Sequence, residues 1–223
     1  MLTALRPRRR PRRPGERGAV AVEAALITPL LVLLVVGIIE FSLVLRDYVS
    51  VTSATRSGAR IASANAGAGP QVCDTDEFVA GCSNTSAPQL ALAAATAVQL
   101  QGTALNKDQI QYLLVYKANA SGYPGSSTRT SWGSDPKADC LASAGCVVYT
   151  WVKASDKFRF AGGAWTSSTI NACVSNSDSV GVYLRSLHPY ATKMFGSSIT
   201  VSDRTVMRFE PLTASVCSAG THP

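Results

Sequence analysis

The sequence predicts an α+β protein in which a long N-terminal transmembrane helix is followed by a disulfide-stapled extracytoplasmic domain. A long apolar run follows an arginine-rich tail, all six cysteines lie beyond that run, and the remaining chain alternates branched, aromatic-rich segments with Gly/Ser-rich loops. We expect the domain to pack a helix on a mainly antiparallel sheet. The chain accordingly divides into a basic cytoplasmic leader (1–18), a transmembrane helix with an amphipathic extension (19–64) and the external α+β domain (65–223).

The leader carries nearly all of the net charge of the chain. Its seven arginines oppose one acid, Glu16, which gives +6 of the total +7. Recognition of nucleic acid usually needs basic side chains spread over a folded face with aromatic residues among them. Here they stand in a Pro/Arg tail, so we expect no nucleic-acid partner. These arginines are Arg6, Arg8, Arg9, Arg10, Arg12, Arg13 and Arg17.

The apolar segment from Ala24 to Leu45 is long enough to cross a bilayer, because as a helix it rises about 33 Å. Cationic flanks stay on the cytoplasmic side. We therefore expect a single-pass protein of the cytoplasmic membrane, with its N-terminus in the cytoplasm and its C-terminal domain outside. Pro29, Glu23 and Glu40 interrupt the run. Carboxylates are costly in lipid, so such residues usually face a partner or lie close enough to the interface to reach water. Both interpretations stay open for Glu40, whereas Glu23 needs another explanation.

A cleaved secretory signal peptide is the competing interpretation of a basic tail before an apolar run. It requires a small-residue cleavage site immediately after the apolar core. The nearest A-x-A motif, at residues 62–64, comes about twenty residues too late for a signal peptidase. We therefore expect the apolar segment to be retained.

The string G-A-V-A-V-E, Gly18 to Glu23, stands where the leader meets the apolar segment. Here the chain resembles type IV prepilins, in which a peptidase cuts after the glycine that ends a basic leader and a glutamate occupies the fifth mature position. The resemblance implies cleavage between Gly18 and Ala19, with Glu23 as the fifth residue. Glycine lets a membrane peptidase grip extended backbone, and a carboxylate buried in an assembly can pair with the new amino terminus of a neighbouring subunit.

A wider stretch, residues 17–41 followed by T-S-A-T-R-S-G-A-R at 52–60, is similar to the TadE-like family of pseudopilins. The resemblance also extends weakly to T-V-M-R-F-E-P-L at 205–212. It implies a minor pilin that is a structural or assembly component of a Tad (Flp) type IV pilus. The implied partners are a prepilin peptidase, other pilus or pseudopilin subunits, assembly proteins and the lipid bilayer. Aromatic residues often follow the glutamate in the major Flp pilins, whereas Ala24 stands here, which argues against the main fibre subunit.

Beyond the membrane the helix is expected to continue as an amphipathic segment, because apolar and small residues recur at steps of three and four. Arg46, Arg56 and Arg60 lie opposite this stripe, and Asp47 interrupts it. Two interpretations stay open: the stripe covers the sheet of its own chain, or it contacts another subunit. Its members are Val44, Tyr48, Val51, Ala54, Gly58 and Ile61.

The external domain is expected to contain one helix and four strands. Pro88 suits the first turn of the helix, and Gly102 suits its end. The strands are indicated by branched and aromatic residues. The expected elements are a helix at 87–101, strands at 109–117, 146–153, 179–185 and within 198–209, and Gly/Ser loops at 119–145 and 154–178.

The cysteines indicate disulfides rather than a metal site. An even number of cysteines on one side of the membrane segment suits an oxidising compartment. No C-x2-C pair occurs, and neither His188 nor His222 stands near a cysteine pair in a zinc-like arrangement, so we expect no metal and no cofactor. Short spacings favour two loop-closing pairs and leave a third, although sequence alone does not fix the pairing: Cys73–Cys82, Cys140–Cys146 and Cys173–Cys217.

Nothing in the sequence indicates an enzyme. It contains neither a G-x-S-x-G elbow nor a phosphate-binding loop, and His188, before Pro189, is expected in a loop or on the surface. Trp132, Trp165 and Tyr123 are expected to pin their loops to the domain rather than to bind partners or glycans. The alternative function is a membrane-anchored or secreted cysteine-stapled binding module unrelated to pili.

Overall fold

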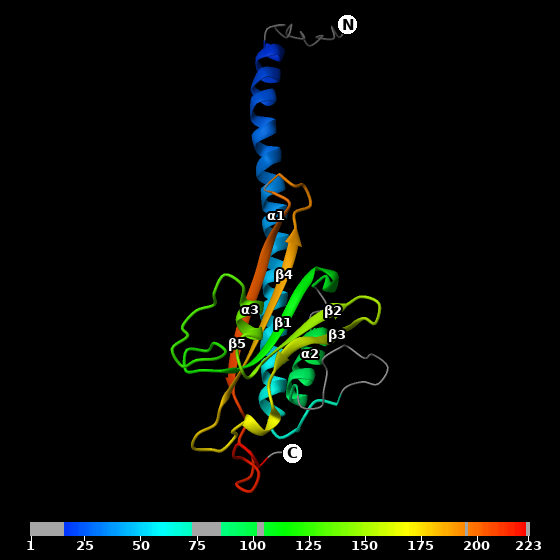
Figure 1. Cartoon of the computed structure of the whole chain (residues 1–223). Helices are drawn as coiled ribbons and strands as arrows, with labels where there is room; N and C mark the ends of the chain where they lie inside the picture. The colour runs from blue at the N-terminus through cyan, green and yellow to red at the C-terminus, as the bar shows by residue number, and fades with distance from the viewer. Residues whose placement is uncertain (1–15, 73–85, 102–104, 195, 222–223) are drawn as a thin grey trace, which may run out of the picture. The chain divides into compact units, whose positions relative to one another are not determined.

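The computed structural model describes residues 16–72, 86–101, 105–194 and 196–221. The chain forms two compact units, Met1–Ser42 and Leu43–Pro223. The first helix, α1 (Glu16–Ala64), runs through the boundary between them. All other elements belong to the second unit (Figure 1): α2 (Gln89–Gln101), a 3-10 turn (Lys107–Gln109), β1 (Ile110–Ala118), α3 (Pro136–Leu141), β2 (Cys146–Val152), β3 (Lys157–Ala164), a 3-10 turn (Ser167–Thr169), β4 (Ser179–Pro189) and β5 (Ser198–Arg208).

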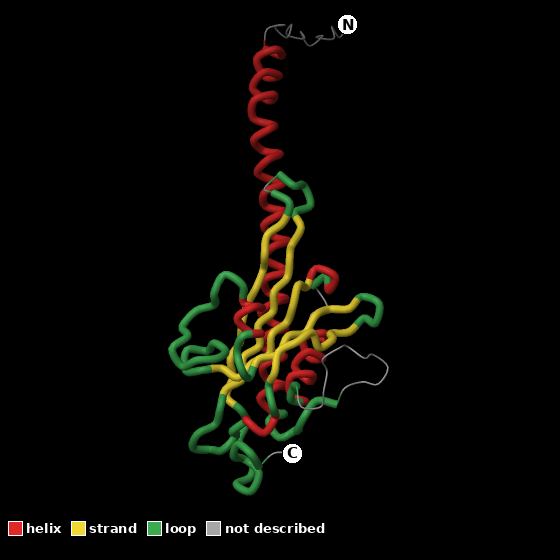
Figure 2. The backbone as a smooth tube through the Cα atoms, viewed as in Figure 1, coloured by secondary structure: helices red, strands yellow, loops and turns green. Residues whose placement is uncertain are grey.

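The second unit is built on a five-stranded sheet in the order β3-β2-β1-β4-β5, in which every neighbouring pair is antiparallel. Figure 2 shows its strands in yellow. β1 therefore lies at the centre, and β4 and β5 form a long hairpin beside it. The predicted α+β class is confirmed: a long apolar N-terminal helix precedes a helix that packs on an antiparallel sheet.

Strand β3 corrects the prediction that residues 154–178 form a loop. Phe158 and Phe160 alternate with outward residues and are buried, as in a half-buried strand. Gly162 and Gly163 lower the strand propensity of the segment, which is why the sequence favoured a loop. The structure needs glycine at 163: its φ is +90°, and a Cβ there would lie 2.3 Å from the carbonyl oxygen of Cys146.

The main core lies between one face of the sheet and the helices α1 and α2. Val51 and Ala54 of α1 are fully buried in it. Gly58 allows α2 to approach α1 closely, since a Cβ at this position would lie only 2.8 Å from Cγ2 of Val98 and 3.3 Å from Cγ1 of Val182. The middle of the small-residue stripe therefore covers the sheet and α2 of its own chain, whereas Tyr48 at the near end of the stripe is exposed.

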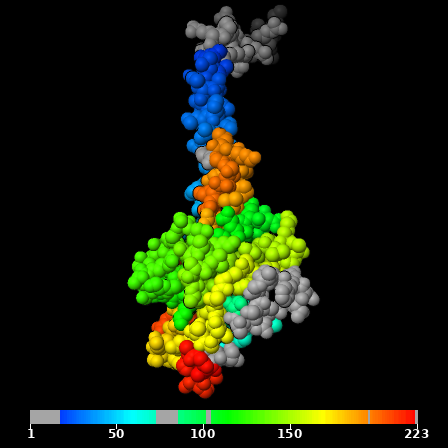
Figure 3. Space-filling view, viewed as in Figure 1, coloured from blue at the N-terminus to red at the C-terminus, as the bar shows by residue number. Residues whose placement is uncertain are grey.

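The opposite face of the sheet carries a second cluster of buried side chains, covered by the loop 119–145 and by α3. The Trp132 ring lies 5.5 Å from that of Tyr116 and 5.1 Å from that of Tyr183. Trp132 thereby holds its loop against the strands. In Figure 3 the green residues of this region form a broad part of the visible surface.

Candidate membrane and assembly site

Most of the part of α1 that lies in the first unit is apolar and exposed. Leu26 and Phe41, for example, are 75% and 63% exposed. Among the residues that the structure describes, one helical stretch is long and apolar enough to cross a membrane, Gly18–Ala64, with a mean hydropathy of 2.6 in its most apolar window and none of that window buried. A soluble surface rarely carries apolar area of this extent. This helix therefore has the character of a membrane anchor.

Gly18, Ala19 and Glu23 lie in the first turns of α1, which begins at Glu16. All three are exposed, and a Cβ placed on Gly18 would meet no atom within 4 Å. Ala19 and Glu23 are four residues apart, so they lie on one face of the helix in adjacent turns. The backbone at Gly18 is thus free of neighbouring side chains among the described residues, and the exposed carboxylate of Glu23 lies on the same helix face as Ala19.

Two further interruptions of the apolar run have different environments. Pro29 lies inside α1 without ending it, although proline lacks the N–H that the carbonyl four residues earlier would accept. Glu40 is only 2% exposed. Of the two interpretations left open for this residue, its burial favours a partner over water at the outer interface.

The second unit holds a buried acid–histidine pair close to its first residue. Nδ1 of His188 lies 2.6 Å from Oδ2 of Asp47, and both side chains are buried. The guanidinium of Arg46 contacts the other carboxylate oxygen, Oδ1, at 3.2 Å. With an ionised Asp47, the His188 Nδ1–H donates and the carboxylate accepts. One carboxylate oxygen of Asp47 thus contacts the buried His188 ring, and the other contacts the half-exposed guanidinium of Arg46.

This position of His188 corrects the expectation of a loop or surface histidine. β4 extends to Pro189 rather than ending near Arg185. Side chains alternate along a strand, so His188 lies on the same face as the buried Leu184. Its Nε2 is buried and has no hydrogen-bond partner among the described residues. The sequence contained one signal for this pair, the acid Asp47 within an otherwise apolar stripe.

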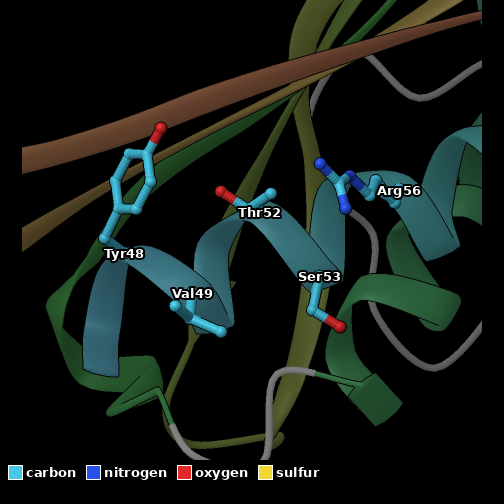
Figure 4. Close-up of a pocket in the computed structure, with 5 residues that line it drawn as sticks. All are labelled: Tyr48, Val49, Thr52, Ser53 and Arg56. Carbon is cyan, nitrogen blue, oxygen red and sulfur yellow. The ribbon is translucent and has the colours of Figure 1, made fainter. Parts of the chain in front are cut away.

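A shallow groove of about 290 Å³ lies on the outer side of α1, just beyond Asp47 (Figure 4). Its residues are spaced by three and four along the helix and therefore share one face. Tyr48 and Arg56 line its two ends, and both are exposed. The remaining lining residues are Val49, Thr52 and Ser53.

The comparison with known families matches this same segment. Residues 18–60 match the family described as TadE-like protein. Residues 18–60 therefore form a TadE-like segment within the N-terminal helix. No curated protein and no solved structure matches the chain. The TadE-like match begins at Gly18 and ends at Arg60, so it contains Glu23 and Asp47 and leaves the sheet outside. This TadE-like segment associates the chain with the Tad pilus and, in general terms, with pilus components.

The two disulfides found among the described residues lie in the second unit. Cys140 is bonded to Cys146 and Cys173 to Cys217; the sequence predicted the first pair from its short spacing and the second as the remaining pair. Cys73 and Cys82 lie outside the described residues. Cys140–Cys146 joins α3 to the start of β2. Cys173–Cys217 joins the segment between β3 and β4 to the segment that follows β5.

Proposed function

We propose that this TadE-like protein is a minor pilin, or pseudopilin, that a prepilin peptidase cuts between Gly18 and Ala19 and that acts as a structural or assembly component of a Tad (Flp) type IV pilus. The observation that carries the proposal is the start of the TadE-like match at Gly18. At this residue a leader with a charge of +6, seven arginines less one acid, gives way to an exposed apolar helix.

The charge distribution supports an orientation with the leader in the cytoplasm. Arginines beside a membrane segment are retained on the cytoplasmic side, and the sheet domain with its disulfides then lies in the oxidising space outside. Removal of residues 1–18 leaves a chain of about +1, since the leader holds +6 of the total +7. Cleavage thus removes the positive charges that most strongly attract this end of the helix to the anionic lipids of the inner leaflet.

The exposed helix supports lateral assembly. In lipid there is no hydrophobic drive between helices, so their association depends on van der Waals packing and on polar contacts. Glu23 is a polar group placed within the apolar helix, and an ionised carboxylate in lipid is stable only with a partner. The new amino group of Ala19 on a neighbouring subunit has the complementary charge.

The test is mass spectrometry of the mature N-terminus of the full-length protein, in cells with and without the prepilin peptidase. We expect an Ala19 start that requires the enzyme and that disappears in Gly18→Val. Glu16→Gln, which changes the leader but not the cleavage site, is the matched control and should be cut normally. A Met1 start in cells with active peptidase would contradict the proposal. A start near Ala64 would instead identify the secreted alternative.

A further inference from the structure

The β4–β5 hairpin runs alongside the first part of α1 in the second unit. The hydroxyls of Thr55 and Thr205 lie 3.1 Å apart, and the contact between Asp47 and His188 fixes a second point. From Thr55 back to Asp47 the helix descends about 12 Å, and β4 continues in that same direction up to His188. The turn of the hairpin therefore extends from the end of β4 toward the first residues of the second unit.

This end of the hairpin lies at the level where the apolar run stops. Leu45 is the last residue of the run, and Arg46 and Asp47 are the charges that follow it. The Arg46 side chain is 58% exposed, as suits a cation at the edge of a bilayer. His188 is held at Asp47, so the turn that follows His188 begins beside the first charged residues after the apolar run.

The described turn residues have the chemistry of a membrane interface. Tyr190 packs edge-on against His188 at 6.0 Å between ring centroids. Lys193 is exposed, and Met194 is 55% exposed. No acid occurs from His188 to Ser202. Tyrosine and lysine are favoured at the lipid–water boundary, and an exposed methionine supplies apolar area.

We propose that the β4–β5 turn, at Tyr190–Met194, rests on the outer leaflet of the bilayer that α1 crosses, with Met194 at the acyl boundary and Lys193 at the lipid phosphates. The bilayer contact depends on the membrane anchor and not on cleavage at Gly18, so the two proposals fail independently. A second contact beside α1 limits rotation and tilt of the sheet domain. The domain then presents a defined face to neighbouring subunits.

The test is photo-crosslinking of the full-length protein in vesicles of phosphatidylethanolamine and phosphatidylglycerol. A benzophenone amino acid replaces Met194, and the control carries it at Val174, which is 78% exposed. Val174 lies at the other end of the domain, since Ala172 accepts from the backbone N–H of Leu212 and the nearby Glu210 N–H donates to Ser63 near the end of α1. We expect lipid adducts at 194 and few at 174.

Charge reversal supplies the second arm of this test. Lys193→Glu should reduce the lipid adducts at 194 roughly fivefold, because an anionic surface repels the new carboxylate. Lys157→Glu, an exposed lysine on β3, is the control and should leave them unchanged. Equal adducts at 194 and 174, or no effect of Lys193→Glu, would overturn the proposal. Adducts at 194 to protein instead of lipid would also overturn it and assign the turn to a protein partner.

Discussion

Nδ1 of His188 lies 2.6 Å from Oδ2 of Asp47, and this contact joins the end of β4 to α1 two residues after the apolar run stops. The two residues are 141 positions apart in the chain. The pair is buried, so its net contribution depends on both partners being present. The contact thus joins the turn end of the β4–β5 hairpin to α1.

Removal of Asp47 should destabilise the domain strongly. We expect Asp47→Ala to lower the free energy of unfolding by about 3 kcal/mol, because it leaves the buried His188 ring without its acceptor. Glu210→Ala removes an exposed acid and should change it by less than about 0.5 kcal/mol. Denaturant unfolding of the detergent-solubilised protein measures both. Equal losses in the two variants would contradict the structural role of the pair.

Close packing at Gly58 gives a second prediction. Gly58→Ala should cost about 1–3 kcal/mol of stability, since the new methyl group meets Cγ2 of Val98 at 2.8 Å and the carbonyl oxygen of Ala94 at 3.3 Å. Val98→Ala clears the first of these contacts. In a double-mutant cycle, the cost of Gly58→Ala should therefore be smaller in the Val98→Ala background. Additive effects would show that the two helices do not meet at this point.

Buried tyrosines should make the domain sensitive to alkali. Burial raises the pKa of Tyr149 well above its usual value, and its hydroxyl donates to Oε1 of Gln71 at 2.5 Å. The folded state keeps this proton while the unfolded chain loses it near pH 10, so stability should fall by about 1.4 kcal/mol per pH unit above about pH 10. Below that pH the contribution is fully present.

The measurement is the unfolding free energy of wild type, Tyr149→Phe and Tyr48→Phe between about pH 8 and 11. Tyr149→Phe should lose much of the alkaline slope, whereas the change at the exposed Tyr48 should keep it. Burial also raises the pKa of Tyr116, so part of the slope should persist in Tyr149→Phe. An unchanged slope in that variant would refute the assignment.

The two disulfides in the described part of the chain should differ in their contribution to stability. In the chain-entropy account, the stabilisation by a disulfide grows with the logarithm of the number of residues in the loop that it closes. Cys173 and Cys217 are 44 residues apart, whereas Cys140 and Cys146 are 6 apart. Replacing the first pair with serines should cost about 4 kcal/mol and replacing the second pair about 2 kcal/mol. Unfolding of the two double variants under non-reducing conditions measures the difference, and the reverse order would contradict the account.

The sequence predicted those features whose signal is local. The apolar run, the strand 109–117 and the helix after Pro88 follow from composition and periodicity, and the structure has β1 at Ile110–Ala118 and α2 at Gln89–Gln101. The contact of Asp47 with His188 was missed because it depends on the register of a hairpin against a helix. The glycines at 162–163 concealed β3, since they are required by a close backbone approach and not by strand propensity.

Glu23 gives a prediction that separates cleavage from assembly. Glu23→Gln keeps the size of the side chain and removes its charge, so processing at Gly18 should continue while lateral association weakens. A polar contact between membrane helices contributes about 1 kcal/mol, which corresponds to a roughly fivefold loss of association. Quantitative crosslinking of the membrane-embedded protein to other pilin-like subunits measures this loss, with Glu16→Gln as the control. Because Glu16 leaves with the leader, its replacement should have no effect; a similar loss in both variants would mean that Glu23 faces no partner amine.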